Sequence, residues 1–220
     1  MKKLNYELCL FYTAAFIGGF FGGYAVMRSD MFASSQTMNI LTMMLNLFGN
    51  NLGEFLIRFC IMLIYAGAIS VCILVPRYTK LDIRLISAVV TAVSSVIMAF
   101  IPADVTSVLS LLPIFVAMAI QWNAFPGALG YQAACIFVTN NFRQALVNGI
   151  NYLCSKDKKY ISGFWFYLGD LCFFLSGFSV CYIGVKLAGL SFVASIVLVS
   201  VFMIVLIVRD RKIQNTEINA

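Results

Sequence analysis

The sequence predicts an all-α polytopic membrane protein with six transmembrane helices and two re-entrant (broken) half-helices, arranged as two inverted three-span repeats. Three observations lead to this prediction: the apolar composition, a polar segment that occurs twice, and the charge of the connecting segments. Hydrophobic residues make up 62% of the 220 residues and charged residues 11%, with a mean hydropathy of +0.94. Soluble domains carry about 25% charged residues, so the composition excludes the soluble classes.

Length and charge limit the function further. At about 20 residues per span, the chain has room for six or seven spans and almost no domain outside the membrane. The net charge of +6 comes from short clusters between apolar runs, where positive residues set orientation, so we expect no nucleic-acid partner. The chain lacks histidine, the commonest metal ligand. We expect no metal and no cofactor, and we interpret the seven cysteines as apolar packing residues, with metal or redox work as the alternative.

Six apolar runs are the expected spans. The first, 8–27, follows Met-Lys-Lys as a signal peptide would, but no small-residue cleavage site leads into a polar chain, so we interpret it as a span. Its glycines favour close packing against another helix, and room for a solute is the alternative. These glycines are Gly18, Gly19, Gly22 and Gly23. The other runs are 55–75, 85–101, 108–123, 163–185 and 190–208.

Two related polar segments interrupt this pattern. The triplet Thr37-Met-Asn39 returns 102 residues later as Thr139-Asn-Asn141, and each triplet precedes a stretch long enough for a helix. Serine and threonine are good helix N-caps. Irregular backbone at membrane depth is tolerated only when it is buried in protein or lines a wet cavity. We therefore expect half-helices near 35–48 and 137–153.

The charge of the turns favours segments that do not cross the membrane. If 31–48 and 131–153 are re-entrant and the N-terminus is cytoplasmic, the basic turns at 77–84, 156–159 and 209–212 all fall inside, while the Asp104 turn falls outside. If both segments cross, the 77–84 turn faces outside, against the positive-inside bias. We expect re-entrant segments and cytoplasmic N- and C-termini.

Three spans per half make the expected repeat inverted, because an odd number of spans brings the second half in from the opposite side. The tripeptide Ser70-Val-Cys72 also matches Ser179-Val-Cys181, and the basic turn at 155–159 accounts for the longer offset. We expect repeat 1 at 1–101, repeat 2 at 102–212 and a polar tail at 213–220.

The starts of the two half-helices are the expected solute site. A helix N-terminus has unpaired N–H groups and a partial positive charge, which suits an anionic or dipolar group, and inverted-repeat transporters build sites from broken helices. Alternatively, these polar side chains only hold helices together. The expected solute-binding residues are Gln36, Thr37, Asn39, Gln121, Asn123, Thr139, Asn140, Asn141 and Arg143.

Charged residues near the apolar runs have more than one interpretation. Arg143 follows Thr139 by about one turn, and it either binds an anion or pairs with Asp170 in the fifth span. An intramembrane charge is a functional hypothesis by default. Because there is no histidine, a coupled proton would have to use Asp170 or Glu54. Glu54 and Arg58 also have the i,i+4 spacing of a helical salt bridge.

The same segments resemble a known family. Four stretches carry the resemblance: Gly19-Phe-Phe-Gly22-Gly23, Phe32-Ala-Ser-Ser-Gln36-Thr37-Met38-Asn39, Gln121-Trp-Asn123-Ala124 and Thr139-Asn140-Asn141. They are similar to the YoaK-type family of bacterial inner-membrane proteins, a family of unknown function with about six predicted spans. The family usually has Thr-Gly-Asn where this chain has Met38 or Asn140, and often an acidic residue at the place of Gly22. The resemblance covers nearly the whole chain and implies a multi-pass protein of the bacterial inner membrane.

The function we expect is a membrane transporter or channel for a small polar solute, anionic solutes included. An enzyme needs a nucleophile–base pair or a metal cluster, and a chain without histidine and with few buried acids gives no sign of either, so we expect no enzyme. The alternative from another class is a non-transporting membrane scaffold or receptor component. A homo-oligomer is also open, since the glycine face of the first span can pack within the protomer or against another subunit.

Overall fold

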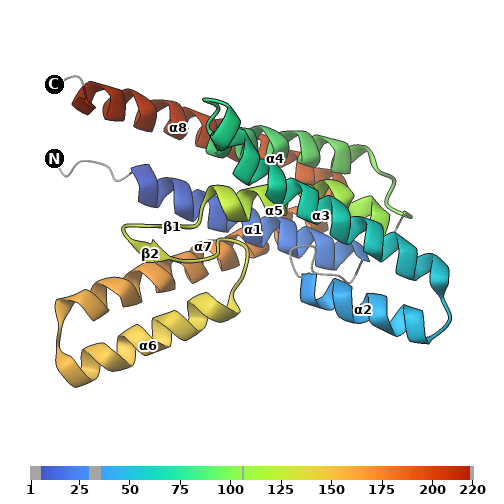
Figure 1. The fold of residues 1–220 in the computed structure, drawn as a ribbon, viewed down its shortest axis with the longest axis horizontal. Coiled ribbons are helices and arrows are strands. Elements are labelled where there is room, and N and C mark those ends of the chain that lie inside the picture. The colour runs from blue at the N-terminus through green and yellow to red at the C-terminus, as the bar shows by residue number, and fades with distance from the viewer. Residues whose placement is uncertain (1–5, 30–35, 106, 219–220) are drawn as a thin grey trace.

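The computed structural model describes residues 6–29, 36–105 and 107–218, with side chains up to residue 213. This part of the chain is helical apart from one short β-hairpin (Figure 1). The helices are α1 (Tyr6–Ser29), α2 (Gln36–Phe48), α3 (Leu52–Tyr78), α4 (Ile83–Phe100), α5 (Leu112–Ala124), α6 (Thr139–Ser155), α7 (Lys158–Ala188) and α8 (Ile196–Ile218). Two 3₁₀ turns, η1 (Val108–Leu111) and η2 (Leu190–Ser195), precede α5 and α8.

Six of these elements correspond to the six expected spans. In the described part of the chain, α1, α3, α4, α7 and η2–α8 are long and apolar enough to cross a membrane, and η1–α5 (Val108–Ala124) is a shorter apolar helix. Many large apolar side chains on them are exposed, such as Leu74, Phe100 and Leu187, which suits contact with lipid. The protein is an all-α polytopic membrane protein, as the composition predicts. Helix α8 continues to Ile218, so the first part of the expected polar tail is helical.

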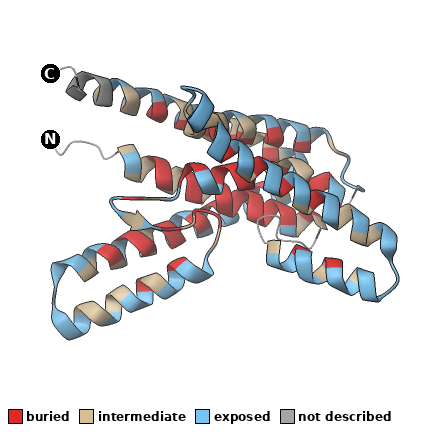
Figure 2. Ribbon diagram, in the orientation of Figure 1, coloured by how far each residue is buried: buried red, intermediate tan, exposed pale blue. Residues whose placement is uncertain are grey.

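Helix α1 is the centre of the fold. Figure 2 shows it buried along most of its length, whereas α2 and α6 are exposed over much of theirs. Phe11, Phe20, Phe21 and Tyr24 are among the largest fully buried side chains. A helix that is apolar on all sides is expected to be surrounded by other elements, and α1 packs against α7, α8 and α5.

Glycines let neighbouring backbones approach α1 directly. A Cβ atom on Gly19 would collide with the backbone carbonyl of Phe174 in α7, and one on Gly177 of α7 would collide with the α1 backbone in return. On the other side of α1, a Cβ atom on Gly18 would collide with the carbonyl of Cys135, in the connection that leads to α6. The prediction that the α1 glycines serve close packing is therefore confirmed at these positions.

Arg28 fixes the last turn of α1. Its buried guanidinium donates to the carbonyls of Pro102 (2.6 Å) and Val105 (3.1 Å), which follow the end of α4, and to the hydroxyl of Tyr24 (3.0 Å). The carbonyls at a helix C-terminus need donors, and a cation at that position is attracted by the partial negative charge of the helix end. This interruption of the apolar run is therefore a clamp between α1 and α4.

The two expected half-helices form, with bounds within two residues of the predicted ones. Helix α2 begins near the middle of the molecule and runs to the right-hand end of Figure 1, and α6 begins near the middle and runs to the left-hand end. Each turns back into a long apolar helix, α3 or α7, and packs against it. Residues 31–35 of the first polar segment lie outside the described residues.

A β-hairpin, absent from the sequence-based expectations, precedes α6. Strands β1 (Gly127–Ala128) and β2 (Tyr131–Gln132) pair antiparallel around Leu129 and Gly130, both with positive φ (56° and 80°). Two positive φ angles are typical of the tight type I′ turn. The hydroxyl of Tyr167 in α7 donates to the carbonyl of Gln132 (2.9 Å), which holds the hairpin against that helix.

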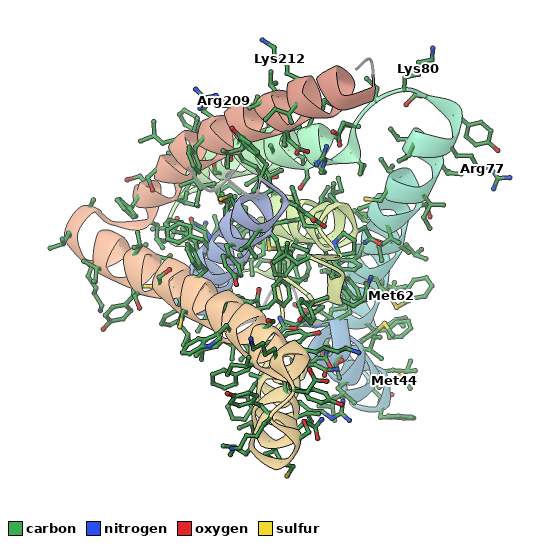
Figure 3. The ribbon with its side chains drawn as sticks, turned by 90° about the vertical axis from the view of Figure 1, so that its left-hand side faces the viewer. Met44, Met62, Arg77, Lys80, Arg209 and Lys212 are labelled. Carbon is green, nitrogen blue, oxygen red and sulfur yellow. The ribbon has the colours of Figure 1, made fainter. Side chains whose placement is uncertain are left out.

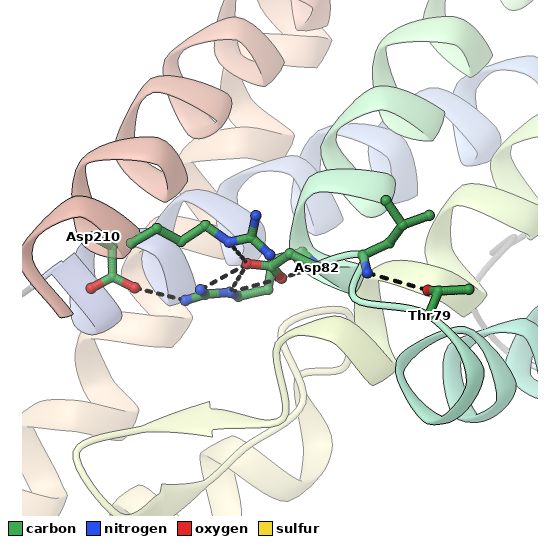
Figure 4. Close-up of polar contacts among 6 residues, drawn as sticks. Thr79, Asp82 and Asp210 are labelled. Carbon is green, nitrogen blue, oxygen red and sulfur yellow. Dashed lines mark hydrogen bonds and ion pairs between the residues drawn. The ribbon is translucent and has the colours of Figure 1, made fainter. Parts of the chain in front are cut away.

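An ion cluster joins α4 to α8 at the end of the molecule where both termini lie (Figures 1 and 4). Asp82 caps α4 by accepting from the backbone N–H of Arg84 (2.9 Å). Its carboxylate pairs with the guanidinium groups of Arg84 and Arg211, both at 2.9 Å, and Arg84 pairs with Asp210, also at 2.9 Å. Figure 3 shows Arg77, Lys80, Arg209 and Lys212 pointing outward at this end.

The Asp82 cluster predicts lower stability in acid. Burial raises the pKa of the Asp82 carboxyl, but hydrogen bonds from Arg84 and the charges of Arg84 and Arg211 outweigh burial and hold this pKa below its ordinary value. A carboxyl with a lowered pKa in the folded state stabilises the fold above its unfolded pKa of about 4 and loses that contribution as pH falls through the folded pKa. Thermal unfolding in detergent measured across this range should show the loss, and Asp82→Asn should remove its share of the pH dependence. An unchanged acid profile in Asp82→Asn would contradict this assignment.

The backbone contact of α1 predicts that Gly19→Ala destabilises the protein. The added methyl group has no room beside the Phe174 carbonyl, and overpacking costs about 1–3 kcal/mol. The matched control is Gly67→Ala on α3, where an added Cβ meets nothing within 4 Å and helix propensity favours alanine. The thermal midpoint in detergent should fall for Gly19→Ala and stay level or rise for Gly67→Ala. Equal midpoints would contradict the close packing of α1 on α7.

Candidate functional site

A cavity of about 870 Å³ lies between the starts of α2 and α6. Helix α2 contributes Gln36 and Thr37 to its wall, and α6 contributes Thr139, Asn140 and Arg143. The remaining wall comes from α3, α5 and the connection between α5 and α6. The two polar segments, about half the chain apart in sequence, therefore face one cavity.

Five of the nine expected solute-binding residues line the cavity, and four do not. The physical reason is clearest in the two Thr-x-Asn triplets. Residues two positions apart on an α-helix point about 200° apart, so the threonine and the asparagine of one triplet cannot face the same space. Thr37 and Thr139 line the cavity, whereas Asn39 and Asn141 are buried on the opposite faces of their helices.

Asn39 joins α2 to α3. Its side chain is 3% exposed, and its Oδ1 lies 3.5 Å from Nη1 of Arg58. Arg58 also pairs with Glu54 at 3.5 Å, as the i,i+4 spacing predicts. Glu54 is absent from the described wall of the cavity. These three residues hold the α2–α3 hairpin together and do not contact the cavity.

Asn141 has the most hydrogen bonds of the expected site residues. Its Nδ2 donates to the carbonyls of Ala134 (2.8 Å) and Phe137 (2.9 Å) and to Oδ2 of Asp170 (2.5 Å), and its Oδ1 accepts from the N–H of Ala134 (3.3 Å). Asp170 and Arg143 form no ion pair in the structure, although both side chains are described. Of the two interpretations of Arg143, pairing with Asp170 is therefore wrong, and Asp170 is bound by the amide of Asn141.

The two polar residues near the end of α5 also point away from the cavity. Gln121 is fully buried and donates to the carbonyl of Ala14 in α1 (2.8 Å), while Asn123 is exposed and donates back to Ala119 (2.8 Å). Trp122, the residue between them, lines the cavity. Successive residues of an α-helix point about 100° apart, so Gln121 and Asn123 face away from the space that Trp122 faces.

Sequence reasoning missed four polar or aromatic members of the wall: Tyr65, Trp122, Gln132 and Phe137. Tyr65 is 4% exposed, and its hydroxyl has no hydrogen-bond partner in the described part of the protein. Both polar atoms of the Gln36 side chain are likewise buried without a described partner. For Tyr65 the available signal was a hydroxyl-bearing aromatic residue in the middle of an apolar run.

The wall of the cavity is electropositive. Arg143 is the charged side chain among the described lining residues, and it lies on the same face of α6 as Thr139, one turn earlier. Val138, which precedes α6, provides no side-chain cap for the first N–H groups of this helix, which lack partners within the helix itself. A positive helix end next to an arginine suits a ligand with negative charge or strong acceptors.

This geometry assigns different effects to two neighbouring asparagines. Asn141→Ala should destabilise the protein, because unsatisfied buried polar groups cost about 1–3 kcal/mol, whereas Asn140→Ala changes an exposed residue of the cavity wall and should leave stability nearly unchanged. Thermal midpoints of the two purified variants provide the comparison. A larger loss in Asn140→Ala than in Asn141→Ala would overturn the assignment.

Comparison with known proteins places most of the chain in one family. No significant match exists among curated proteins, and none exists among solved structures. The family described as "Protein of unknown function (DUF1275)" matches residues 10–208, a range that contains the cavity wall and nearly all of the spans. This match confirms the resemblance to an uncharacterised family. The chain belongs to the DUF1275 family of proteins of unknown function.

Proposed function

We propose that this protein is a membrane transporter or channel for a small polar solute, that anionic solutes are favoured, and that the solute binds between the starts of α2 and α6. The observation that carries the proposal is the cavity itself. It brings Gln36 and Thr37 together with Thr139, Asn140 and Arg143 inside a protein that exposes many large apolar side chains. No reaction is assigned to the site.

Unpartnered polar atoms at the cavity support ligand or water binding. The hydroxyl of Tyr65 and the amide of Gln36 are buried without a hydrogen-bond partner among the described residues. Leaving such groups unsatisfied costs about 1–3 kcal/mol each. A bound polar solute, or water in its absence, removes that cost. A scaffold protein has no comparable need for a polar cavity between two helix ends.

The arrangement of the half-helices supports alternating access. Helices α2 and α6 lead away from the cavity in opposite directions (Figure 1), as expected for inverted repeats with a site near mid-depth. Arg77, Lys80 and Arg209, on the segments next to the ion cluster, point outward (Figure 3), which supports a cytoplasmic location for the end of the molecule where both termini lie. In this proposal the protein spans the bacterial inner membrane, and each half-helix leads from the cavity toward one side of that membrane.

Anion access to the cavity can be measured through Trp122. The chain has two tryptophans, and Trp165→Phe leaves Trp122, which lines the cavity, as the single reporter. Iodide should quench its fluorescence, and Arg143→Gln should lower the iodide quenching constant about fivefold, because removing one nearby positive charge weakens attraction by about 1 kcal/mol. Lys156→Gln, which removes an exposed charge outside the described cavity wall, is the control and should have little effect.

Caesium, a cationic quencher, should not lose efficiency in Arg143→Gln. Equal iodide quenching in the parent protein and Arg143→Gln would contradict an anion-favouring cavity.

Transport itself is tested by flux into proteoliposomes over a panel of anions and neutral metabolites. Absence of flux for the whole panel, with iodide access intact, would favour a receptor or scaffold role.

A further inference from the structure

We infer that Asp170 is protonated in this conformation and that loss of its proton changes the wall of the cavity. As a coupling mechanism this inference rests on the proposed transport function, whereas the protonation itself does not. The carboxyl group lies within α7 and is 1% exposed. One of its oxygens accepts from Asn141, and the other has no hydrogen-bond partner in the part of the chain that the structure describes.

Among the residues that the structure describes, none brings a compensating positive charge to Asp170. Helix α7 packs against α1, α6 and η2. From α1, Tyr12 lies within electrostatic reach, as do Cys135 from the connection before α6 and Tyr167 of α7 itself. Both tyrosine hydroxyls donate to backbone carbonyls, α6 contributes the uncharged amide of Asn141, and η2 has no titratable residue.

An ionised carboxylate in these surroundings would be buried with a single neutral donor. Buried charges are normally paired, and otherwise the group neutralises. A protonated carboxylic acid carries no net charge, so its burial costs less free energy than burial of the carboxylate. Its carbonyl oxygen accepts from Asn141, and its O–H is the group without a described partner. The structure therefore corresponds to the neutral, protonated form of Asp170.

Asn141 connects this proton to the cavity. Its Nδ2 has two hydrogens but three acceptors: Asp170 and the carbonyls of Ala134 and Phe137. Ala134 and Phe137 both line the cavity. When the Asp170 O–H loses its proton to water, the carboxylate that remains accepts more strongly from the Asn141 amide. The amide then favours Asp170 over the two carbonyls, and the wall formed by residues 134–137 loosens.

Infrared spectroscopy tests the protonation without any solute. Reconstituted protein at neutral pH should show an absorption band of a protonated carboxyl group. The band should be absent in Asp170→Asn and present in Glu54→Gln, which removes an acid paired with Arg58. Raising the pH of the wild-type protein should remove the band, so the test does not depend on the variants alone. A band that is unchanged in Asp170→Asn, or absent from the wild type, would overturn the inference.

The fluorescence of Trp122 tests the link to the cavity. Its ring packs edge-to-face on Phe137, with centroids 5.1 Å apart. In the Trp165→Phe background, the emission should shift over the same pH range in which the infrared band disappears. This shift should be lost in Asp170→Asn and retained in Glu54→Gln. A shift that persists in Asp170→Asn would contradict the link. Both readouts can succeed even if no solute is transported, so a failure of the proposed function is distinguishable.

Discussion

The fold depends on backbone-to-backbone contacts on two sides of α1, at Gly19 and at Gly18. At Gly19 the α7 backbone occupies the space of a side chain, and at Gly18 the carbonyl of Cys135 does the same. In a membrane, helices have no hydrophobic driving force toward one another, so close packing at small residues is a main source of association. Because α1 holds both α7 and the connection that precedes α6, it fixes Asp170, Asn141 and one wall of the cavity relative to each other.

The polar residues divide into those that face the cavity and those that hold it in shape. Thr37, Thr139 and Arg143 face the cavity, while Asn39 and Asn141 bind the half-helices to neighbouring elements. The division follows from helical geometry, since alternate residues of a helix face opposite directions. A repeated Thr-x-Asn triplet therefore combines one residue for the cavity with one for the framework.

Much of the helical fold could be predicted from the sequence, because apolar runs of sufficient length determine the spans. The starts of α2 and α6 were also predictable, to within two residues, from the polar Thr-x-Asn triplets that interrupt the apolar runs. The β-hairpin at 127–132 was not, because its turn residues are Leu129 and Gly130 and not the usual Asn-Gly. The cavity wall was only half predictable: the sequence shows which residues are polar, but the roles of Tyr65, Trp122 and Asp170 depend on how distant helices pack.

The central claim is that two half-helices meet at one cavity and leave it toward opposite sides of the membrane. Single cysteines at the exposed positions Leu52 and Lys158, after α2 and α6 respectively, can be placed in a background without the seven native cysteines. A membrane-impermeant maleimide should label Leu52→Cys from outside intact cells and Lys158→Cys only in inverted vesicles. Labelling of both positions from the same side would contradict the account.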